Sequence, residues 1–178
     1  MQKKWGDTMK LYHGSNTQIR NINLSMCRPY KDFGTGFYLT DIKEQAERMA
    51  LRVSKIYGGT PVLNIFEIQD DFTMLPNINI KNFGELTTED WAKFVMNNRN
   101  RSFENVKDVL CNRDNKYDIV IGPVADDNMA LLFRQYENEL IDFSTLLKGM
   151  IYKKSSMQYS FHTEKSIKLL RKVDDKNE

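Results

Sequence analysis

The chain has 178 residues, of which 40% are hydrophobic and 28% charged, and these proportions are typical of one soluble globular domain rather than of a disordered or fibrous protein. Its 26 basic and 24 acidic residues give a net charge of +2, which argues against a strongly basic nucleic-acid-binding domain but is compatible with a local basic patch. The sequence has no membrane-length apolar run, no apolar signal region in MQKKWGDTMK, and only two distant cysteines, so we expect a cytoplasmic protein without disulfides.

The first half of the chain begins with a loosely attached extension at residues 1–8, and we expect the folded domain to span residues 9–172. The segment KLYH (10–13) predicts a short strand, which ends in a tight turn at HGS. KDFGTGFYLT (31–40) predicts a glycine-containing loop that enters a buried strand at FYL. An amphipathic helix is expected at 41–57, with Asp41 as its N-cap in a capping box with Glu44 and Gly58-Gly59 at its end.

The second half alternates strand and helix signals. The patterns predict strands at 61–68, 117–122 and 157–163, helices at 87–99, 126–140 and 142–151, then a short basic helix and a polar tail at 173–178. In the last strand, alternation places Met157, Tyr159 and Phe161 on one face and Gln158, Ser160 and His162 on the other. The chain is therefore expected to be an α+β domain with strands early and late and helices between them.

Three segments place polar or aromatic groups at strand ends: LYHGS (11–15), GTGFYLTD (34–41) and QYSFHT (158–163). In order and spacing they resemble the three motifs of the ADP-ribosyltransferase superfamily, in its diphtheria-toxin and poly(ADP-ribose) polymerase branch, which carries a His-Tyr-Glu triad. The chain is also similar to an uncharacterised bacterial family of small proteins with LYHGS, DFGxGFYLT and QxSFHT signatures.

The resemblance implies an ADP-ribosyltransferase-like fold, in which two packed, mainly antiparallel sheets flanked by helices form a cleft for NAD. It implies His13, Tyr38 and Gln158 as the catalytic set, with NAD as substrate and no metal. His13 would hydrogen-bond a ribose hydroxyl, the Gly14 backbone would hold the nicotinamide amide, and Tyr38 would stack on the nicotinamide ring. The other implied NAD-binding residues are Ser15 on the adenosine side, Arg28 at the pyrophosphate, Gly36 in the Tyr motif, and Met49 as a wall for the nicotinamide.

Gln158 stands where this branch carries its catalytic glutamate. An amide oxygen still accepts a hydrogen bond from a ribose hydroxyl, but it has no charge to stabilise the cation that develops as the N-glycosidic bond breaks. Another carboxylate would then supply the charge, with Glu164, Asp126, Asp127 and Glu137 as candidates. Asp126 and Asp127, in GPVADDN, are equally explained as an ordinary helix cap.

The function implied by the resemblance is transfer of ADP-ribose from NAD to a macromolecular acceptor, with release of nicotinamide. The near-neutral charge favours a protein acceptor over a nucleic acid. By similarity to small bacterial transferases, the protein is expected to be a toxin that a partner protein inhibits. Two alternatives remain open: an NAD glycohydrolase with water as acceptor, and a module that binds NAD, ADP-ribose or a protein without turnover.

Overall fold

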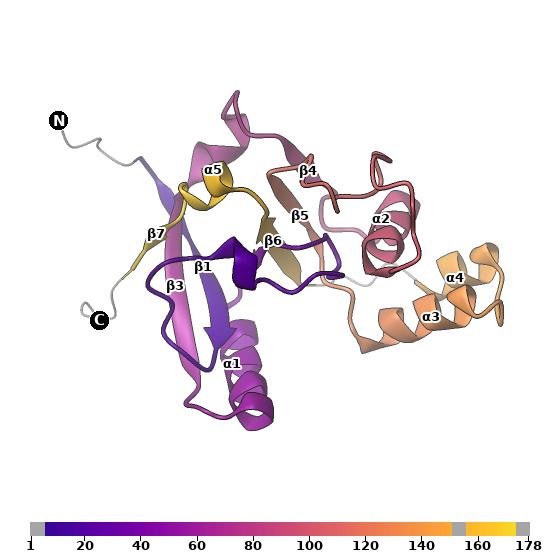
Figure 1. The fold of residues 1–178 in the computed structure, drawn as a ribbon, viewed down its shortest axis with the longest axis horizontal. Coiled ribbons are helices and arrows are strands. Elements are labelled where there is room, and N and C mark those ends of the chain that lie inside the picture. Colours follow the sequence, from indigo (N-terminus) through magenta and orange to yellow (C-terminus); the bar gives the residue numbers. More distant parts are fainter. Residues whose placement is uncertain (1–5, 151–155, 174–178) are drawn as a thin grey trace.

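Two β-sheets form the centre of the fold (Figure 1). The computed structural model describes residues 6–150 and 156–173. One sheet has three antiparallel strands in the order β1 (Thr8–Ser15), β3 (Val62–Gln69) and β7 (Arg171–Lys172). The other has four strands in the order β2 (Phe37–Leu39), β6 (Met157–Phe161), β5 (Ile119–Pro123) and β4 (Ile80–Asn82), and only its β4–β5 pair is parallel.

Five α-helices surround these sheets in the part of the chain that the structure describes. They are α1 (Lys43–Tyr57), α2 (Glu89–Arg99), α3 (Asp127–Glu137), α4 (Phe143–Gly149) and α5 (Glu164–Ile167), with short 3-10 turns at Leu24–Met26 and Asp70–Met74. In Figure 1, α1 lies beside the three-stranded sheet, and α2, α3 and α4 gather at the opposite end of the molecule. No helix among the described residues has the length and apolar character needed to cross a bilayer.

The α+β class and the main elements agree with the prediction from sequence. Asp126 and Asp142 cap α3 and α4, and Thr88 caps α2. The strands β4 and β7 were not predicted, because each is too short to carry a clear periodic pattern. Parts of three predicted segments lie outside the described residues. They are residues 1–5 of the extension, residue 151 of the helix predicted at 142–151, and residues 174–178 of the tail.

The predicted capping box at Asp41 is wrong. Helix α1 begins at Lys43 with Ile42 as its N-cap, and no side chain caps it. Burial raises the pKa of the Tyr159 phenol to about 12, and the Asp41 carboxylate adds to this shift. The Thr40 hydroxyl accepts from the Ile42 amide at 3.2 Å. The hydroxyl of Thr40, and not the carboxylate of Asp41, thus bonds a backbone amide just before the helix.

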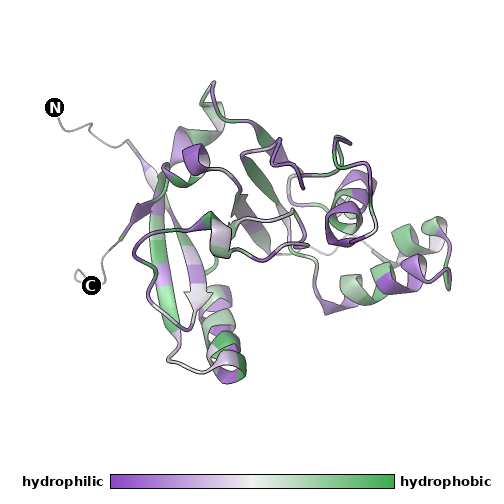
Figure 2. Ribbon diagram, in the orientation of Figure 1, coloured by the Kyte–Doolittle hydropathy of each residue, from purple (hydrophilic) through white to green (hydrophobic). Residues whose placement is uncertain are grey.

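The space between the sheets is a hydrophobic core. Its buried members come from both sheets and include Leu11, Phe66 and Ile68 on one side and Phe37, Ile119 and Phe161 on the other. The opposite face of the four-stranded sheet packs against α2, α3 and α4 through a second core around Phe33, Trp91 and Phe94. Figure 2 shows the same division, since the central strands are largely hydrophobic and the helices carry mixed faces.

The strands β1 and β2 diverge from one bridge. Tyr12 and Thr40 exchange two backbone hydrogen bonds, of 2.7 and 2.9 Å. Because successive residues of a strand direct their amide groups to alternate edges, the N–H and C=O of Gly14 also point toward β2 and not toward β3. Among the described residues they have no hydrogen-bond partner outside the strand ladder. We call this divergence of β1 and β2 beyond the Tyr12–Thr40 bridge the fork. On its β1 side, the backbone groups of Gly14 are unpaired.

Helix α1 packs directly on Gly14. A Cβ atom at this position would lie 1.9 Å from the Ala46 carbonyl oxygen and 2.6 Å from the Ala50 nitrogen, and both alanines are buried. A backbone atom cannot move aside as a flexible side chain can, so only glycine fits. The small side chains of Ala46 and Ala50, and the absence of a side chain at Gly14, let the helix pack close to β1 beside the fork.

Gly14→Ala is accordingly expected to lower the free energy of unfolding by about 3 kcal/mol, the upper range for overpacking in a core. Urea denaturation followed by circular dichroism measures this change. Gly6→Ala is the control, because nothing lies within 4 Å of a Cβ built there. Equal stability of the two variants would contradict the account of how α1 meets β1.

Candidate functional site

His13 lies at the fork between β1 and β2. Its Nδ1 is 2.7 Å from the Tyr38 carbonyl oxygen, and its ring stacks on Phe37 with 4.5 Å between ring centroids. Because a carbonyl only accepts, Nδ1 carries the proton and donates, which leaves Nε2 as an acceptor. Burial lowers the pKa of His13, the hydrogen bond to Tyr38 partly opposes this, and Lys172 and Lys31 lower it further. The imidazole is therefore neutral at physiological pH.

The free nitrogen of His13 reaches solvent. Nε2 has no hydrogen-bond partner among the described residues, and in that part of the chain only Thr87 Oγ1 is both buried and without a partner. An oriented, neutral imidazole thus presents an acceptor at the fork, next to the buried Gly14, whose backbone groups are unpaired among the described residues. This pair of groups suits a ligand that offers a hydroxyl and an amide.

Tyr38 is fixed by the loop that precedes it. Its hydroxyl donates to the Gly34 carbonyl at 2.7 Å and accepts from the Phe33 amide at 3.0 Å. The ring packs against Phe33 and edge-on against His162, and burial raises its pKa well above the usual value. Tyr38 therefore has a hydroxyl that serves structure and a partly exposed ring that remains for stacking.

Gln158 shares a sheet face with Tyr38. Tyr38 is paired with Ser160, and Gln158 lies two residues before Ser160 on the same face of β6. Its Nε2 donates to Asp32 Oδ2 at 2.8 Å and to the Pro123 carbonyl at 3.2 Å. Two acceptors fix the nitrogen of the amide on that side, so Oε1 faces the other way. Oε1 has no partner among the described residues and is not sealed from solvent.

Asp32 is the carboxylate beside Gln158, and the prediction from sequence missed it. It is buried and forms an ion pair with Arg99, whose Nε and Nη2 lie 2.8 and 2.6 Å from Oδ1. The Ala125 amide also donates to Oδ2, at 3.3 Å. Asp32 is the first residue of the DFGTGFYLT segment, which the sequence analysis singled out. Its contact with Gln158, 126 residues further along the chain, exists only in the folded protein.

The four carboxylates expected to supply charge lie elsewhere. Asp126 accepts from the Met129 amide as the cap of α3, while Asp127 is exposed in the first turn of that helix. Glu137 is exposed at the end of α3, and Glu164 is exposed at the start of α5. The carboxylate that contacts Gln158 is that of Asp32, and Arg99 pairs with Asp32.

The remaining predicted residues divide between the α1 side and the core. Arg28 Nη1 donates to the Tyr57 hydroxyl at 2.9 Å, at the C-terminal end of α1. The neighbour of Ser15, Asn16, donates to the Gly58 carbonyl at the same end. Met49 is 48% exposed on α1. Gly36 instead faces His162, whose Nδ1 would lie 2.6 Å from a Cβ at that position.

The structure thus joins His13 to Tyr38 and Tyr38 to the face of Gln158, but it gives no contact between the side chains of His13 and Gln158. Among the described residues, no group of three His, Cys, Asp or Glu side chains is arranged to hold a metal ion. Cys27 and Cys111 are both free thiols.

His162 lies in the core behind Tyr38. Its Nδ1 donates to the Thr35 carbonyl at 2.8 Å, and its Nε2 lies 2.7 Å from the Ser160 hydroxyl. Burial lowers its pKa to about 4, against 6.5 for an ordinary histidine, and the backbone hydrogen bond and Asp118 only partly oppose this. Since the ring is buried and its Nδ1 is committed to backbone, His162 supports the loop and β6.

His162 is expected to make the stability of the protein fall in acid. The unfolded chain takes up a proton at this histidine near pH 6.5 and the folded chain only near pH 4. The stabilisation is complete above pH 6.5 and is lost as the pH falls toward 4, by about 3 kcal/mol. Chemical denaturation across this range measures it, with His162→Gln as the comparison. Identical slopes for the two proteins would contradict the assignment.

A family model described as "protein of unknown function (DUF3990)" matches residues 9–171. The chain therefore belongs to this family, and the matched range includes residues of every strand and all of the site residues above. No curated protein and no solved structure is similar enough to the chain to give a match.

Proposed function

We propose that this protein is an NAD-dependent ADP-ribosyltransferase, which transfers ADP-ribose from NAD to a macromolecular acceptor and releases nicotinamide. The observation that carries the proposal is the fork between β1 and β2. There, a neutral His13 with an accessible Nε2 lies beside the unpaired backbone of Gly14. Those are the two groups that the resemblance assigns to the ribose and to the nicotinamide amide.

In the proposed reaction, the bond between ribose C1′ and the nicotinamide nitrogen breaks, and its electron pair leaves with neutral nicotinamide. The acceptor attacks C1′ from the opposite face and gives its proton to water. His13 Nε2 and Gln158 Oε1 would each accept a hydrogen bond from a ribose hydroxyl and hold the sugar in place. The partly exposed ring of Tyr38 would stack on nicotinamide, a contact worth about 1 kcal/mol.

The Asp32 carboxylate offers the negative charge that Gln158 lacks. It lies 2.8 Å from Gln158 Nε2, so it polarises the amide and strengthens Oε1 as an acceptor. Its ion pair with Arg99 partly cancels that charge. This cancellation favours a second candidate function, a domain that binds NAD or ADP-ribose with little or no turnover.

Calorimetry with NAD, followed by incubation of the protein with labelled NAD in cell lysate, separates these functions. Transfer predicts NAD binding, nicotinamide release and a labelled macromolecule. Release without an acceptor identifies a glycohydrolase, and binding without release identifies the binding module. Absence of NAD binding would overturn the proposal.

A further inference from the structure

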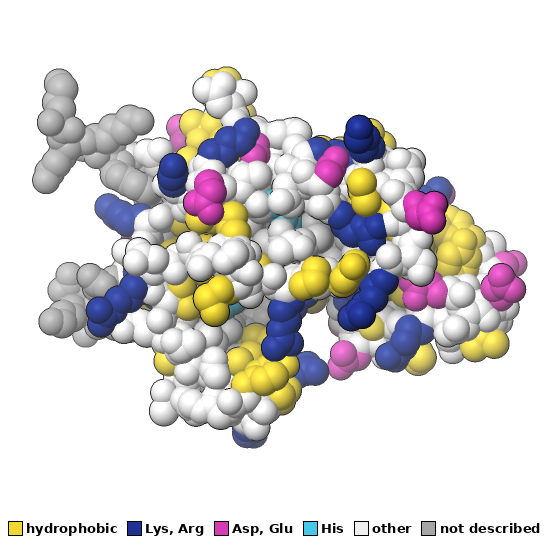
Figure 3. All heavy atoms as spheres, in the orientation of Figure 1, with side chains coloured by type: hydrophobic (Ala, Val, Ile, Leu, Met, Phe, Trp, Pro, Cys, Tyr) yellow, Lys and Arg dark blue, Asp and Glu magenta, His cyan; other side chains and the backbone are white. Residues whose placement is uncertain are grey.

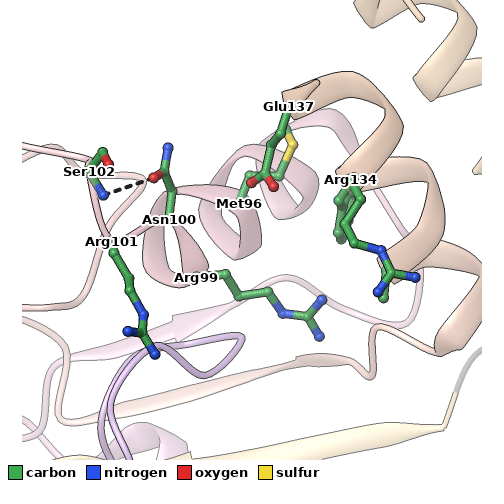
Figure 4. A pocket seen from close by; sticks show the side chains of 9 residues that line it. Met96, Arg99, Asn100, Arg101, Ser102, Arg134 and Glu137 are labelled. Carbon is green, nitrogen blue, oxygen red and sulfur yellow. Dashed lines mark hydrogen bonds between the residues drawn. The ribbon is translucent and has the colours of Figure 1, made fainter. Parts of the chain in front are cut away.

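A pocket of about 580 Å³ lies between the C-terminal end of α2 and α3 (Figure 4). Its volume is within the range of natural ligand sites. Among the described residues that line it, three are arginines, Arg99, Arg101 and Arg134, and one, Glu137, is a carboxylate. In Figure 4 the three guanidinium groups lie toward the lower side of the pocket and Glu137 toward the upper side. The lining thus carries three positive charges and one negative charge, and the positive ones share a side.

The arginines retain unused hydrogen-bond donors. Arg99 spends Nε and Nη2 on Asp32, and its Nη1 has no partner among the described residues. The Arg134 side chain has no partner in that part of the chain, and Arg101 makes only a stacking contact. Guanidinium groups with free edges match the oxygens of phosphate, to which they bind in a forked geometry.

An exposed aromatic ring adjoins the pocket. Tyr30 is 38% exposed, and the guanidinium carbons of Arg101 and Arg113 lie 5.1 and 5.8 Å from its ring centroid. Tyr30 also has a φ of 58°, a conformation that costs about 1 kcal/mol or more for a bulky residue and that turns the loop here. On the face of the molecule drawn in Figure 3, Lys and Arg side chains lie near the middle, on both sides of a notch between α1 and α3.

We infer that this pocket binds phosphate groups of a single-stranded nucleic acid, which is the acceptor of the proposed transfer. Arginines that bind phosphate through their edges, and that stack on bases through guanidinium planes such as that of Arg101 on Tyr30, are a combination that holds single strands. Arg99 lines the pocket and pairs with Asp32, and Asp32 accepts from Gln158, so one ion pair and one hydrogen bond connect the pocket to the side chain proposed to hold the ribose. The near-neutral total charge favoured a protein acceptor, whereas the local arrangement of charge favours nucleic acid. That the bound strand is the acceptor rests on the proposed function, whereas its binding to the pocket does not.

Fluorescence anisotropy with labelled, mixed-sequence single-stranded DNA and RNA tests this inference on the full chain. The variant is Arg101→Ala/Arg134→Ala, which spares Arg99 and its ion pair with the buried Asp32. The control is Arg48→Ala/Arg52→Ala, which removes the same charge from exposed positions of α1. We expect the pocket variant to lose about 10-fold or more in affinity and to reduce the slope of log affinity against log salt by about 1.4, at roughly 0.7 per phosphate contact.

A calorimetric titration with NAD is run on the same variants, because NAD also carries phosphates. NAD affinity that is unchanged while oligonucleotide affinity falls in the pocket variant alone supports the inference. NAD affinity that falls instead would assign the pocket to the dinucleotide and overturn it. Lack of oligonucleotide binding by the wild type, or equal loss in the control variant, would also overturn it. The two oligonucleotide results leave the proposed function untouched, because NAD binding by the wild type is reported by its own titration.

Discussion

Gln158→Glu is expected to destabilise the protein by about 3 kcal/mol, because it sets a second carboxylate against Asp32 and the Pro123 carbonyl in a buried site. Glutamate has no N–H to donate, so three acceptors would face one another. Urea denaturation at neutral pH measures the loss. A stable variant with an unchanged midpoint would show that the Gln158–Asp32 hydrogen bond does not hold β6 to the loop.

The reciprocal exchange Asp32→Asn/Gln158→Glu is expected to recover part of that stability and to raise the rate of nicotinamide release. The amide introduced at position 32 would still accept from Arg99 and would donate to the new carboxylate. The exchange thus moves the negative charge from position 32 to position 158. At position 158 it faces the developing ribose cation, and we expect an increase of about 10²-fold in release. Asp32→Asn alone is the control. A folded, NAD-binding double variant that is no faster than wild type would contradict the role assigned to the missing charge.

The second large effect is expected for His13→Ala. The substitution removes the accessible Nε2 and the hydrogen bond to the Tyr38 carbonyl. One hydrogen bond to the ribose corresponds to about 10-fold in NAD affinity, and loss of ribose positioning adds a decrease of about 10²-fold in nicotinamide release. Calorimetry and a nicotinamide assay measure the two effects separately.

Tyr12→Phe is the matched control for His13→Ala. Tyr12 is the neighbour of His13, its side chain leaves β1 on the opposite face, and its hydroxyl has no partner among the described residues. NAD affinity should stay within about twofold of wild type, as is usual for a change away from the site. A His13→Ala protein that is folded and releases nicotinamide at the wild-type rate would remove His13 from the proposed machinery.

The elements that could be predicted from sequence are those with a strong local pattern. The strand at Met157–Phe161 alternates in hydropathy, and the helices α2, α3 and α4 carry side-chain caps. Asp41 shows the limit of such patterns. A cap residue followed by Glu44 is a strong local signal, yet α1 begins at Lys43 with Ile42 as its N-cap and without a side-chain cap.

For the candidate site, the sequence indicated the positions of His13, Tyr38 and Gln158 but not how they are connected. The hydrogen bond between His13 and the Tyr38 carbonyl depends on the divergence of β1 and β2, which no local motif encodes. Asp32 and Arg99 are even less accessible to pattern reasoning, because 67 residues separate them and their pairing depends on how the loop crosses α2.

The junction at Asp32 has a consequence for the dynamics of the protein. One carboxylate holds together the loop before β2, the end of α2, the start of β6 and the segment after β5, through Arg99, Gln158 and Ala125. The next two residues of that loop, Phe33 and Gly34, hold the hydroxyl of Tyr38. Separating any one of these segments uncovers a buried charge, so local opening here is a cooperative event with a single free energy rather than independent fraying of each loop.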